Sequence, residues 1–435
     1  MQPWTSLTGL RRCSAEPGLA PVIIVAHATV TAIATVDLRI RARKEISQMT
    51  ISVRVPVSPE VLRWAQIRSG KDVENRFPHW RSWLDGVAAP TLRQLEDVAK
   101  YTHVPFGTLL LDEPPSVALP IPDYRRSAAA HGREPSPDLL AVLHQSHRRQ
   151  AWFREYAVEN GLDPHTVPHL DAGTTVTGAA ATCRAMYQLD AVQTTATTRH
   201  AFRAHLRETF EDLGGLVVFT SMVANDTHRL LDRNEFRGFT LVDDVAPLIF
   251  VNTNDSLAGQ AFTFFHELAH LARRDGGLDD EVTEDLLAEP RSDNDLETWC
   301  DLVAAETLAP TATLRQAFNA RLPLTDQLDQ LARRLHVSTL VILLQLRRAG
   351  LVTREGFDET YEAEVERVAG FVDAREPSGG GDFYRLQPYR IGVRLATAII
   401  RDVETGRTSY PEALSLLSLS STAKMDALAA RLASR

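Results

Sequence analysis

Two histidines and a glutamate interrupt one of the most apolar stretches of this chain. The segment AFTFFHELAHLARR contains His266, Glu267 and His270 among phenylalanines, leucines and alanines. On a helix, residues four apart lie on one face, so the two imidazoles of His-Glu-x-x-His can reach the same metal ion. Glu267 lies to the side of that pair, where its carboxylate can take a proton from a metal-bound water. The spacing therefore predicts a metal site suited to hydrolysis, and the apolar flanks predict a water-poor setting.

A third ligand is available on a second apolar helix, LETWCDLVAAETLAP, which comes after a polar loop. A helix that begins at Glu297 can pack antiparallel on the first helix and present the Glu297 carboxylate to the metal. Asp301 lies one turn later on the same face, where it could accept the N–H of a ligating imidazole. Two histidines and one glutamate with an open position favour one zinc ion per chain. Manganese or iron could bind the same ligands, because geometry and availability decide which metal is held.

The alternative is a buried helix whose histidines hydrogen-bond to backbone carbonyl groups. A single buried histidine would favour that alternative. A histidine pair that flanks a glutamate, with an acidic helix downstream, favours the metal site.

The elements around this helix set the expected fold. GGLVVFTS and FRGFTLVDDVAPLIFVNTN are rich in Val, Ile, Phe and Thr, which indicates strands immediately before the histidine helix. We expect a mostly helical α+β fold in which a small sheet supports that helix. The strand PLIFVN could pair with an extended substrate through Ile249, Val251 and Asn252. Farther on, DQLARRLHVSTLVILLQLRRAG has a helix-turn-helix rhythm, but its second helix is too apolar to face DNA, so it should pack against the core around the histidine helix.

The remaining chain divides by composition. Residues 1–48 differ in composition from the rest of the chain, and Met49 is the expected natural start of the protein. Short helices with tight turns come next, which is the layout of a helix-turn-helix module, and one long helix is expected from about Ser136 to Glu159. The expected divisions are a leader, disordered or not native, at 1–48; a helix-turn-helix domain at 49–113; a linker and helical connector at 114–212; a zincin-like metallopeptidase domain at 213–350; and a helical C-terminal domain at 351–435.

The charge of the predicted helix-turn-helix domain is balanced, because residues 58–112 carry as many acidic as basic side chains. A DNA-binding domain usually shows a basic excess. The expected recognition segment, PHWRSWLDG, offers His79, Arg81 and Ser82 to DNA, but its two tryptophans could instead belong to a core. A helical module that docks on another protein is the alternative.

The totals limit the compartment and the partners. The formal net charge is -9, so the surface as a whole does not favour nucleic acid. Cys13, Cys183 and Cys300 are odd in number and far apart, which fits a reducing cytoplasm rather than a disulfide framework. The sequence contains no run of 18 or more apolar residues, so no membrane span is predicted. The composition does not predict an oligomeric state.

These motifs resemble the ImmA/IrrE family of zinc metallopeptidases. FTFFHELAHLA and ETWCDLVAAETLAP carry the resemblance, and it extends to FRGFTLVDDVAPLIFVNTND and GGGDFYRLQPYRIG. LRWAQIRSG and LPIPDYR look like the fused N-terminal helix-turn-helix (XRE-like) domain and linker of longer members. By position, the resemblance implies that His266, His270 and Glu297 bind zinc and that Glu267 is the general base. The family commonly has asparagine where this chain has Asp301. An aspartate four residues after the glutamate resembles the thermolysin-like pattern instead, which strengthens the expectation that Asp301 supports a ligand.

The resemblance also implies a function. It indicates an intracellular zinc endopeptidase of regulatory type, which cleaves a repressor or another regulatory protein after a stress or mobile-element signal. DNA is a further possible partner through residues 58–112. The alternative is a non-proteolytic DNA-binding regulator or antitoxin-like protein in which the metal serves folding or sensing.

Overall fold

The computed structural model describes residues 53–116, 119, 121, 134–275, 278–279, 296–373 and 390–434. The predicted leader at 1–48 and most of residues 114–133, the first part of the predicted linker and connector at 114–212, lie outside the described residues. The chain forms two compact units. Among the described residues, the first unit comprises those up to Arg63 together with Val73–Tyr101 and Pro105–Glu113, and the second comprises Trp64–Asp72, Thr102–Val104 and the chain from Pro114 onward.

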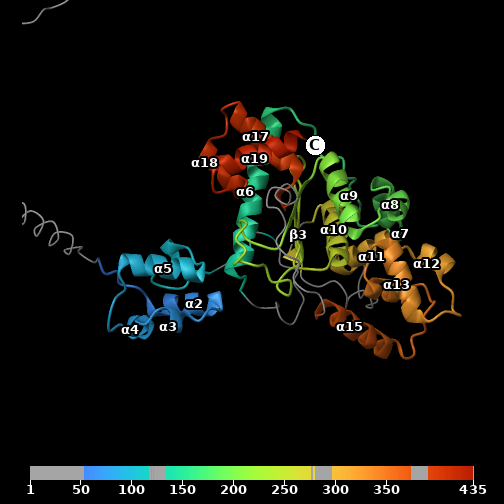
Figure 1. Ribbon diagram of the computed structural model, residues 1–435, viewed down its shortest axis with the longest axis horizontal. Coiled ribbons are helices and arrows are strands. Elements are labelled where there is room, and N and C mark those ends of the chain that lie inside the picture. Colours follow the sequence, from blue (N-terminus) through green and yellow to red (C-terminus); the bar gives the residue numbers. More distant parts are fainter. Residues whose placement is uncertain are drawn as a thin grey trace, which may run out of the picture. The chain divides into compact units, whose positions relative to one another are not determined.

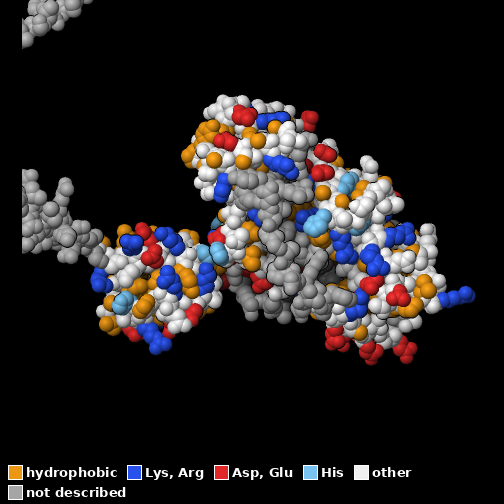
Figure 2. All heavy atoms as spheres, in the orientation of Figure 1, with side chains coloured by type: hydrophobic (Ala, Val, Ile, Leu, Met, Phe, Trp, Pro, Cys, Tyr) orange, Lys and Arg blue, Asp and Glu red, His pale blue; other side chains and the backbone are white. Residues whose placement is uncertain are grey.

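The N-terminal segment is built from short helices, as the sequence predicts. They are α2 (Pro59–Ser69), α3 (Val73–Arg76), α4 (Trp80–Leu84), α5 (Leu92–Thr102) and the 3-10 helix η1 (Phe106–Leu110). Trp80 and Trp83 are buried, and their rings lie edge to face with centroids 6.0 Å apart. The two tryptophans of PHWRSWLDG are therefore core residues. Basic and acidic side chains are interspersed on the face of these helices seen in Figure 2.

The sheet of the second unit is small and mixed. Its strands are β1 (Leu216–Thr220), β2 (Gly238–Leu241), β3 (Leu248–Asn252) and β4 (Leu278–Asp279). They are arranged in the order β1-β3-β2-β4, where β1 and β3 are parallel and the other two pairs are antiparallel.

The position of β3 corrects one prediction. β3 pairs with β1 on one side and with β2 on the other, so it has no free backbone edge to offer a substrate. Ile249, Val251 and Asn252 are buried, and the Asn252 amide donates to the Phe236 carbonyl oxygen. The prediction that these three residues pair with substrate is wrong, because a strand paired on both sides cannot accept another strand.

The two faces of the sheet belong to different apolar cores, as expected when side chains alternate along a strand. The first core takes Val217, Phe219, Ile249 and Val251. The second core takes Leu216, Val218, Phe239, Leu241, Leu248 and Phe250. Gly238 and Thr240 on β2 point toward the first core, since Thr240 hydrogen-bonds to a helix on that side.

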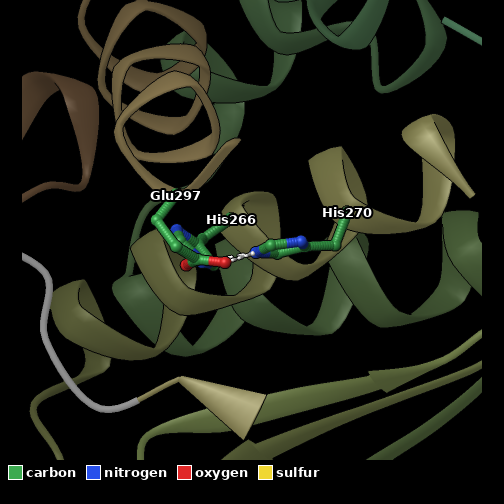
Figure 3. Close-up of side chains that lie close together, drawn as sticks. All are labelled: His266, His270 and Glu297. Atoms are coloured by element: carbon green, nitrogen blue, oxygen red, sulfur yellow. Dashed lines mark hydrogen bonds and ion pairs between the residues drawn. The ribbon is translucent and has the colours of Figure 1, made fainter. Parts of the chain in front are cut away.

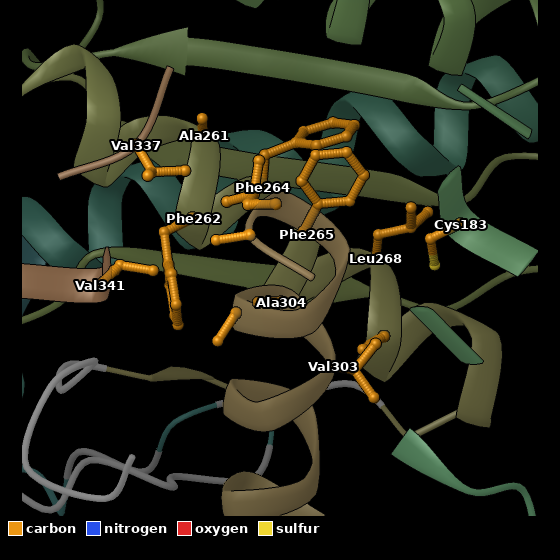
Figure 4. Packing of buried hydrophobic residues seen from close by; sticks show 14 of the residues in the cluster. Cys183, Ala261, Phe262, Phe264, Phe265, Leu268, Val303, Ala304, Val337 and Val341 are labelled. Atoms are coloured by element: carbon orange, nitrogen blue, oxygen red, sulfur yellow. The ribbon is translucent and has the colours of Figure 1, made fainter. Parts of the chain in front are cut away.

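The first core is formed by the helices around α10 (Leu257–Arg273) and α11 (Leu296–Leu308), which pack against each other. Figure 4 shows Phe262, Phe264 and Phe265 of α10 in the same apolar core as Val303 and Ala304 of α11. The other helices that contribute to this core are α7 (Val176–Met186), α8 (Leu189–Thr195), α9 (Arg199–Asp212), α12 (Thr311–Ala317), α13 (Leu324–Leu335), α14 (Thr339–Arg348) and α15 (Phe357–Asp373). Leu328, Leu331 and Leu335 of α13 and residues 341–346 of α14 are buried here, so the prediction that this helix pair packs against the core is confirmed.

The second core is covered by one long helix and the C-terminal helices (Figure 1). They are α6 (Pro137–Glu159), α17 (Val393–Glu404), α18 (Tyr410–Leu416) and α19 (Thr422–Ala433). Ser136 caps α6 by accepting a hydrogen bond from the Leu139 amide, which confirms the predicted start of the long helix. The C-terminal helices thus lie on the face of the sheet opposite α10.

The prediction of a mostly helical α+β protein with a small sheet and a helical C-terminus is confirmed. Within the described ranges, none of the helices has the length and apolarity needed to cross a membrane.

Candidate metal centre

Helix α10 carries the two histidines through the first apolar core. It begins where the Ser256 hydroxyl accepts a hydrogen bond from the Gly259 amide, and it ends at Arg273 before Arg274 adopts a left-handed conformation. A helix that is apolar on nearly all sides is buried on nearly all sides. His266, Glu267 and His270 are only 1–2% exposed, so each of these polar groups needs a partner inside the protein.

Helix α11 brings a carboxylate to the two imidazoles (Figure 3). Glu297 lies in the first turn of α11, with Oε1 3.2 Å from His270 Nε2 and Oε2 3.3 Å from His266 Nε2. The two Nε2 atoms are 3.0 Å apart. Zinc bonds of about 2.0–2.1 Å in a tetrahedron separate neighbouring ligand atoms by about 3.3–3.4 Å. The spacing of these three side chains therefore fits a tetrahedral zinc ion.

The hydrogen bonds behind the imidazoles decide which nitrogen faces the centre. His270 Nδ1 lies 3.1 Å from the Asp275 carbonyl oxygen, which can only accept, so Nδ1 carries the proton. His266 Nδ1 lies 2.8 Å from Asp301 Oδ1 and donates to it in the same way. In a neutral imidazole the Nε2 atom then carries a lone pair. Two lone pairs and a carboxylate converge on one point, and such a set of acceptors calls for a cation.

Electrostatics in the protein alone lead to the same conclusion. Burial by itself would raise the pKa of Glu297, but the hydrogen bonds and charges of His266 and His270 outweigh it and hold that pKa well below its usual range. Burial by itself would lower the pKa of His270, yet the hydrogen bond and charge of Glu297 reverse the effect, so that pKa is raised. The site thus stabilises positive charge next to the Glu297 carboxylate.

The carboxylate of Glu267 lies beside the centre and against the sheet. Its Oε2 atom is 2.7 Å from the Thr240 hydroxyl on β2. It is not among the three side chains whose ligand atoms converge. The structure therefore brings His266, His270 and Glu297 together, with Asp301 behind one imidazole and Glu267 beside the group, and their roles in metal binding and catalysis stay predictions.

Two residues at the site escaped the sequence analysis. Thr240 has no motif that marks it as a partner of Glu267. Gly238, two residues earlier on β2, could have been noticed, because a glycine inside a strand often marks a close approach by another part of the chain. An ideal Cβ atom at Gly238 would lie 2.7 Å from Glu267 Oε1, so only glycine leaves room for that carboxylate.

The predicted DNA contacts lie on the N-terminal helices. His79 and Arg81 are exposed and Ser82 is half-buried. The Arg81 guanidinium is held by an ion pair of 2.9 Å to Glu74. Helix α4 has five residues, two of them core tryptophans, which leaves little of it to enter a DNA groove. DNA binding through this segment stays a prediction.

Comparison with known proteins assigns the region around the centre. Residues 210–347 match the family model of the IrrE N-terminal-like domain, Peptidase_M78. This range contains β1, β2, β3, α10 and α11, and with them all three candidate ligands. The chain carries an IrrE N-terminal-like domain. The resemblance to this family of metallopeptidases is thereby confirmed over residues 210–347.

The rest of the chain is less well assigned. Residues 391–431 match a second family model, a domain of unknown function, DUF8813, which spans α17, α18 and most of α19. The two matches leave the N-terminal helices uncovered, and they give no support to a helix-turn-helix domain there. No curated protein shows a significant match to this chain.

Proposed function

We propose that this protein is a zinc-dependent endopeptidase of regulatory type, whose active site lies in the IrrE N-terminal-like domain. The observation that carries the proposal is the convergence of His266 Nε2, His270 Nε2 and the Glu297 carboxylate, with a second carboxylate, Glu267, beside them. Three protein ligands with one open position are typical of catalytic zinc, whereas structural zinc usually has four protein ligands. Manganese is the runner-up metal for the same ligands.

Different residues of the chain would bind the metal, transfer the proton and orient the imidazoles. A zinc ion at this centre would polarise a peptide carbonyl group and make a bound water more acidic. Glu267 would accept the proton of the attacking water and deliver it to the leaving amine. Asp301 and the Asp275 carbonyl group hold the two imidazoles in the tautomer that presents Nε2 to the centre. The apolar core of α10 and α11 limits the access of other water.

The proposed substrate is a regulatory protein such as a repressor. This part of the proposal rests on the similarity of residues 210–347 to the IrrE-like peptidases and on the presence of additional helices outside that domain. The N-terminal helices would serve to bind DNA or to dock on a partner. Any strand of this protein that pairs with an extended substrate must be a strand other than β3, because β3 is paired on both sides.

The test compares the full-length protein with Glu267→Gln in a soluble extract of cells that lack the gene. New peptide N-termini would be identified by mass spectrometry, and the metal content of both proteins would be measured. We expect cleavage by the zinc-loaded wild type, no cleavage by E267Q, and equal zinc in both. Equal cleavage by E267Q would contradict the role of the base, and absence of cleavage by the zinc-loaded wild type would contradict peptidase function.

A second candidate is a non-proteolytic regulator in which the metal stabilises the fold. One observation favours it: the His266, His270 and Glu297 side chains are each at most 5% exposed, whereas a catalytic metal must be reached by its substrate. Metal removal separates the two functions. A catalytic metal can be removed and restored with the fold intact, whereas loss of a structural metal unfolds the domain, which circular dichroism would detect.

A further inference from the structure

Strand β2 packs against the Glu267 carboxylate beside the metal centre. Gly238 and Thr240 of this strand enclose the carboxylate, and we call these two residues its seat. We propose that Thr240 is a positioning residue for the general base: its hydroxyl group holds the Glu267 carboxylate at the edge of the metal centre and outside the ligand set. This inference rests on the proposed peptidase function and adds a residue that acts through Glu267 rather than on the substrate.

The contact is direct and fully buried. The Thr240 side chain has no solvent exposure. Its Oγ1 atom lies 2.7 Å from Glu267 Oε2 and 2.9 Å from the Glu267 carbonyl oxygen. One hydroxyl group thus touches both the side chain and the backbone of the same residue, which fixes the carboxylate relative to the helix that carries His266 and His270. A hydrogen bond to an ionised group in a buried place is among the stronger ones in proteins.

Gly238 forms the other half of the seat. Residues two apart on a strand point to the same face, so Gly238 and Thr240 both face α10. A Cβ atom at Gly238 would lie 2.6 Å from Thr263 Cγ2 and 2.7 Å from Glu267 Oε1, closer than real Cβ atoms approach. The carboxylate is therefore enclosed by the bare backbone of Gly238 on one side and the hydroxyl group of Thr240 on the other.

This arrangement answers a chemical need. A glutamate next to a divalent metal can turn toward the metal and become a fourth ligand, which would fill the position that water needs. It can also turn away and lose contact with the water, and small misplacements of a reacting group lower rates strongly. A hydroxyl group both donates and accepts, so Thr240 can stay bonded to the carboxyl group before and after proton transfer. The Thr240 hydroxyl thus suits a base that must stay in one place.

A purely structural role makes different predictions. If Thr240 only tied β2 to α10, its loss would lower stability and leave the properties of the metal centre unchanged. The variants T240S and T240A separate the two roles, because they differ only by the hydroxyl oxygen. T240V keeps the shape of threonine and removes the hydroxyl group, so it controls for packing.

The experiment uses the full-length protein loaded with cobalt(II), whose visible spectrum reports on the ligands of the metal. The probe is acetohydroxamic acid, which binds metals as its anion, so that its proton can pass to a neighbouring base on binding. Its dissociation constant would be measured for the wild type, T240S, T240A, T240V and E267Q. Cobalt affinity and thermal unfolding would be measured for the same five proteins.

We expect T240A and T240V to bind acetohydroxamic acid about tenfold more weakly than the wild type, because a Glu267 carboxylate that is no longer held in place is misplaced for the proton of the probe. T240S should bind like the wild type, E267Q should bind most weakly, and cobalt affinity should be similar in all five. If E267Q binds poorly while T240A and T240V match the wild type, Thr240 does not position the base. If T240V fails to fold, the comparison of T240A with T240S gives the same decision.

The proposed function fails in a different way. Failure of the wild type to bind cobalt, or acetohydroxamate affinity in E267Q equal to that of the wild type, would overturn the metal site or the role of Glu267. Either result would also overturn the inference about Thr240, which depends on both.

Discussion

Asp301 offers a test of the metal centre that leaves all three ligands in place. Asp301→Ala removes the carboxylate that accepts the His266 Nδ1 proton, at 2.8 Å, between side chains that are 1% and 2% exposed. The imidazole then loses the partner that fixes its tautomer and orientation. Removal of such a partner typically lowers metal affinity by about 10- to 100-fold, or about 1.4–2.7 kcal/mol.

The assay is a titration of the metal-free protein with zinc in competition with a coloured chelator at fixed pH. Asp301→Asn is the matched control, because an amide oxygen can still accept from His266 Nδ1 while the negative charge is lost. We expect a smaller loss of affinity in D301N than in D301A. The metal-free D301A protein should also be less stable by about 1–3 kcal/mol, since a buried N–H loses this acceptor.

The result that would refute this reasoning is specific. If D301A binds zinc as tightly as the wild type, the hydrogen bond behind His266 does not support a ligand. If D301A loses stability but keeps its zinc affinity, Asp301 serves the fold alone.

The same geometry makes three further predictions. Gly238→Ala should force Glu267 or β2 to move, lower the free energy of unfolding by about 1–3 kcal/mol and reduce cleavage; unchanged stability and cleavage would contradict the tight seat. The metal-stripped protein should be most stable between the ordinary pKa values of glutamate, 4.5, and histidine, 6.5. The lowered pKa of Glu297 stabilises the fold above pH 4.5, and this stabilisation is lost in acid. The raised pKa of His270 stabilises the fold below pH 6.5, and this stabilisation is lost as the pH rises. If the metal-stripped protein needs more urea to unfold in alkali than in this range, the prediction is wrong. Burial raises the pKa of the Cys183 thiol to about 12 despite a hydrogen bond with Thr307, so a thiol reagent at neutral pH should modify Cys183 only after unfolding, as read by peptide mass spectrometry.

The sequence was sufficient for the helices of the centre because their signals are local. The His-x-x-x-His spacing and the apolar flanks of α10 predicted a buried helix with both imidazoles on one side, and Glu297 at the start of the next apolar helix predicted the third ligand. The structure brings these groups within ligand distance of one another.

The order of the strands needed more than local signals. LIFV is a continuous apolar run, which is typical of a strand covered on both faces in the interior of a sheet. Its interpretation as a substrate-binding edge overlooked that pattern, and β3 proves to be central. The placement of α17, α18 and α19 on the face opposite α10 depends on contacts between distant segments, and no short motif records such contacts.

Thr240 shows why a site can include residues that its sequence motif does not mark. A threonine on a strand is ordinary in sequence, and only the register of β2 against β3 and the packing of α10 place its hydroxyl group on Glu267. Gly238 is a stronger signal, but its meaning depends on which carboxylate approaches it.

The central claim is that His266, His270 and Glu297 bind one divalent metal. Anomalous X-ray diffraction at the zinc absorption edge, from crystals of the full-length protein grown with zinc, tests it most directly. The structure predicts a single strong peak bonded to both Nε2 atoms and to the Glu297 carboxylate, and loss of that peak in Glu297→Ala. Absence of the peak in the wild type, or a peak held by other residues, would contradict the claim.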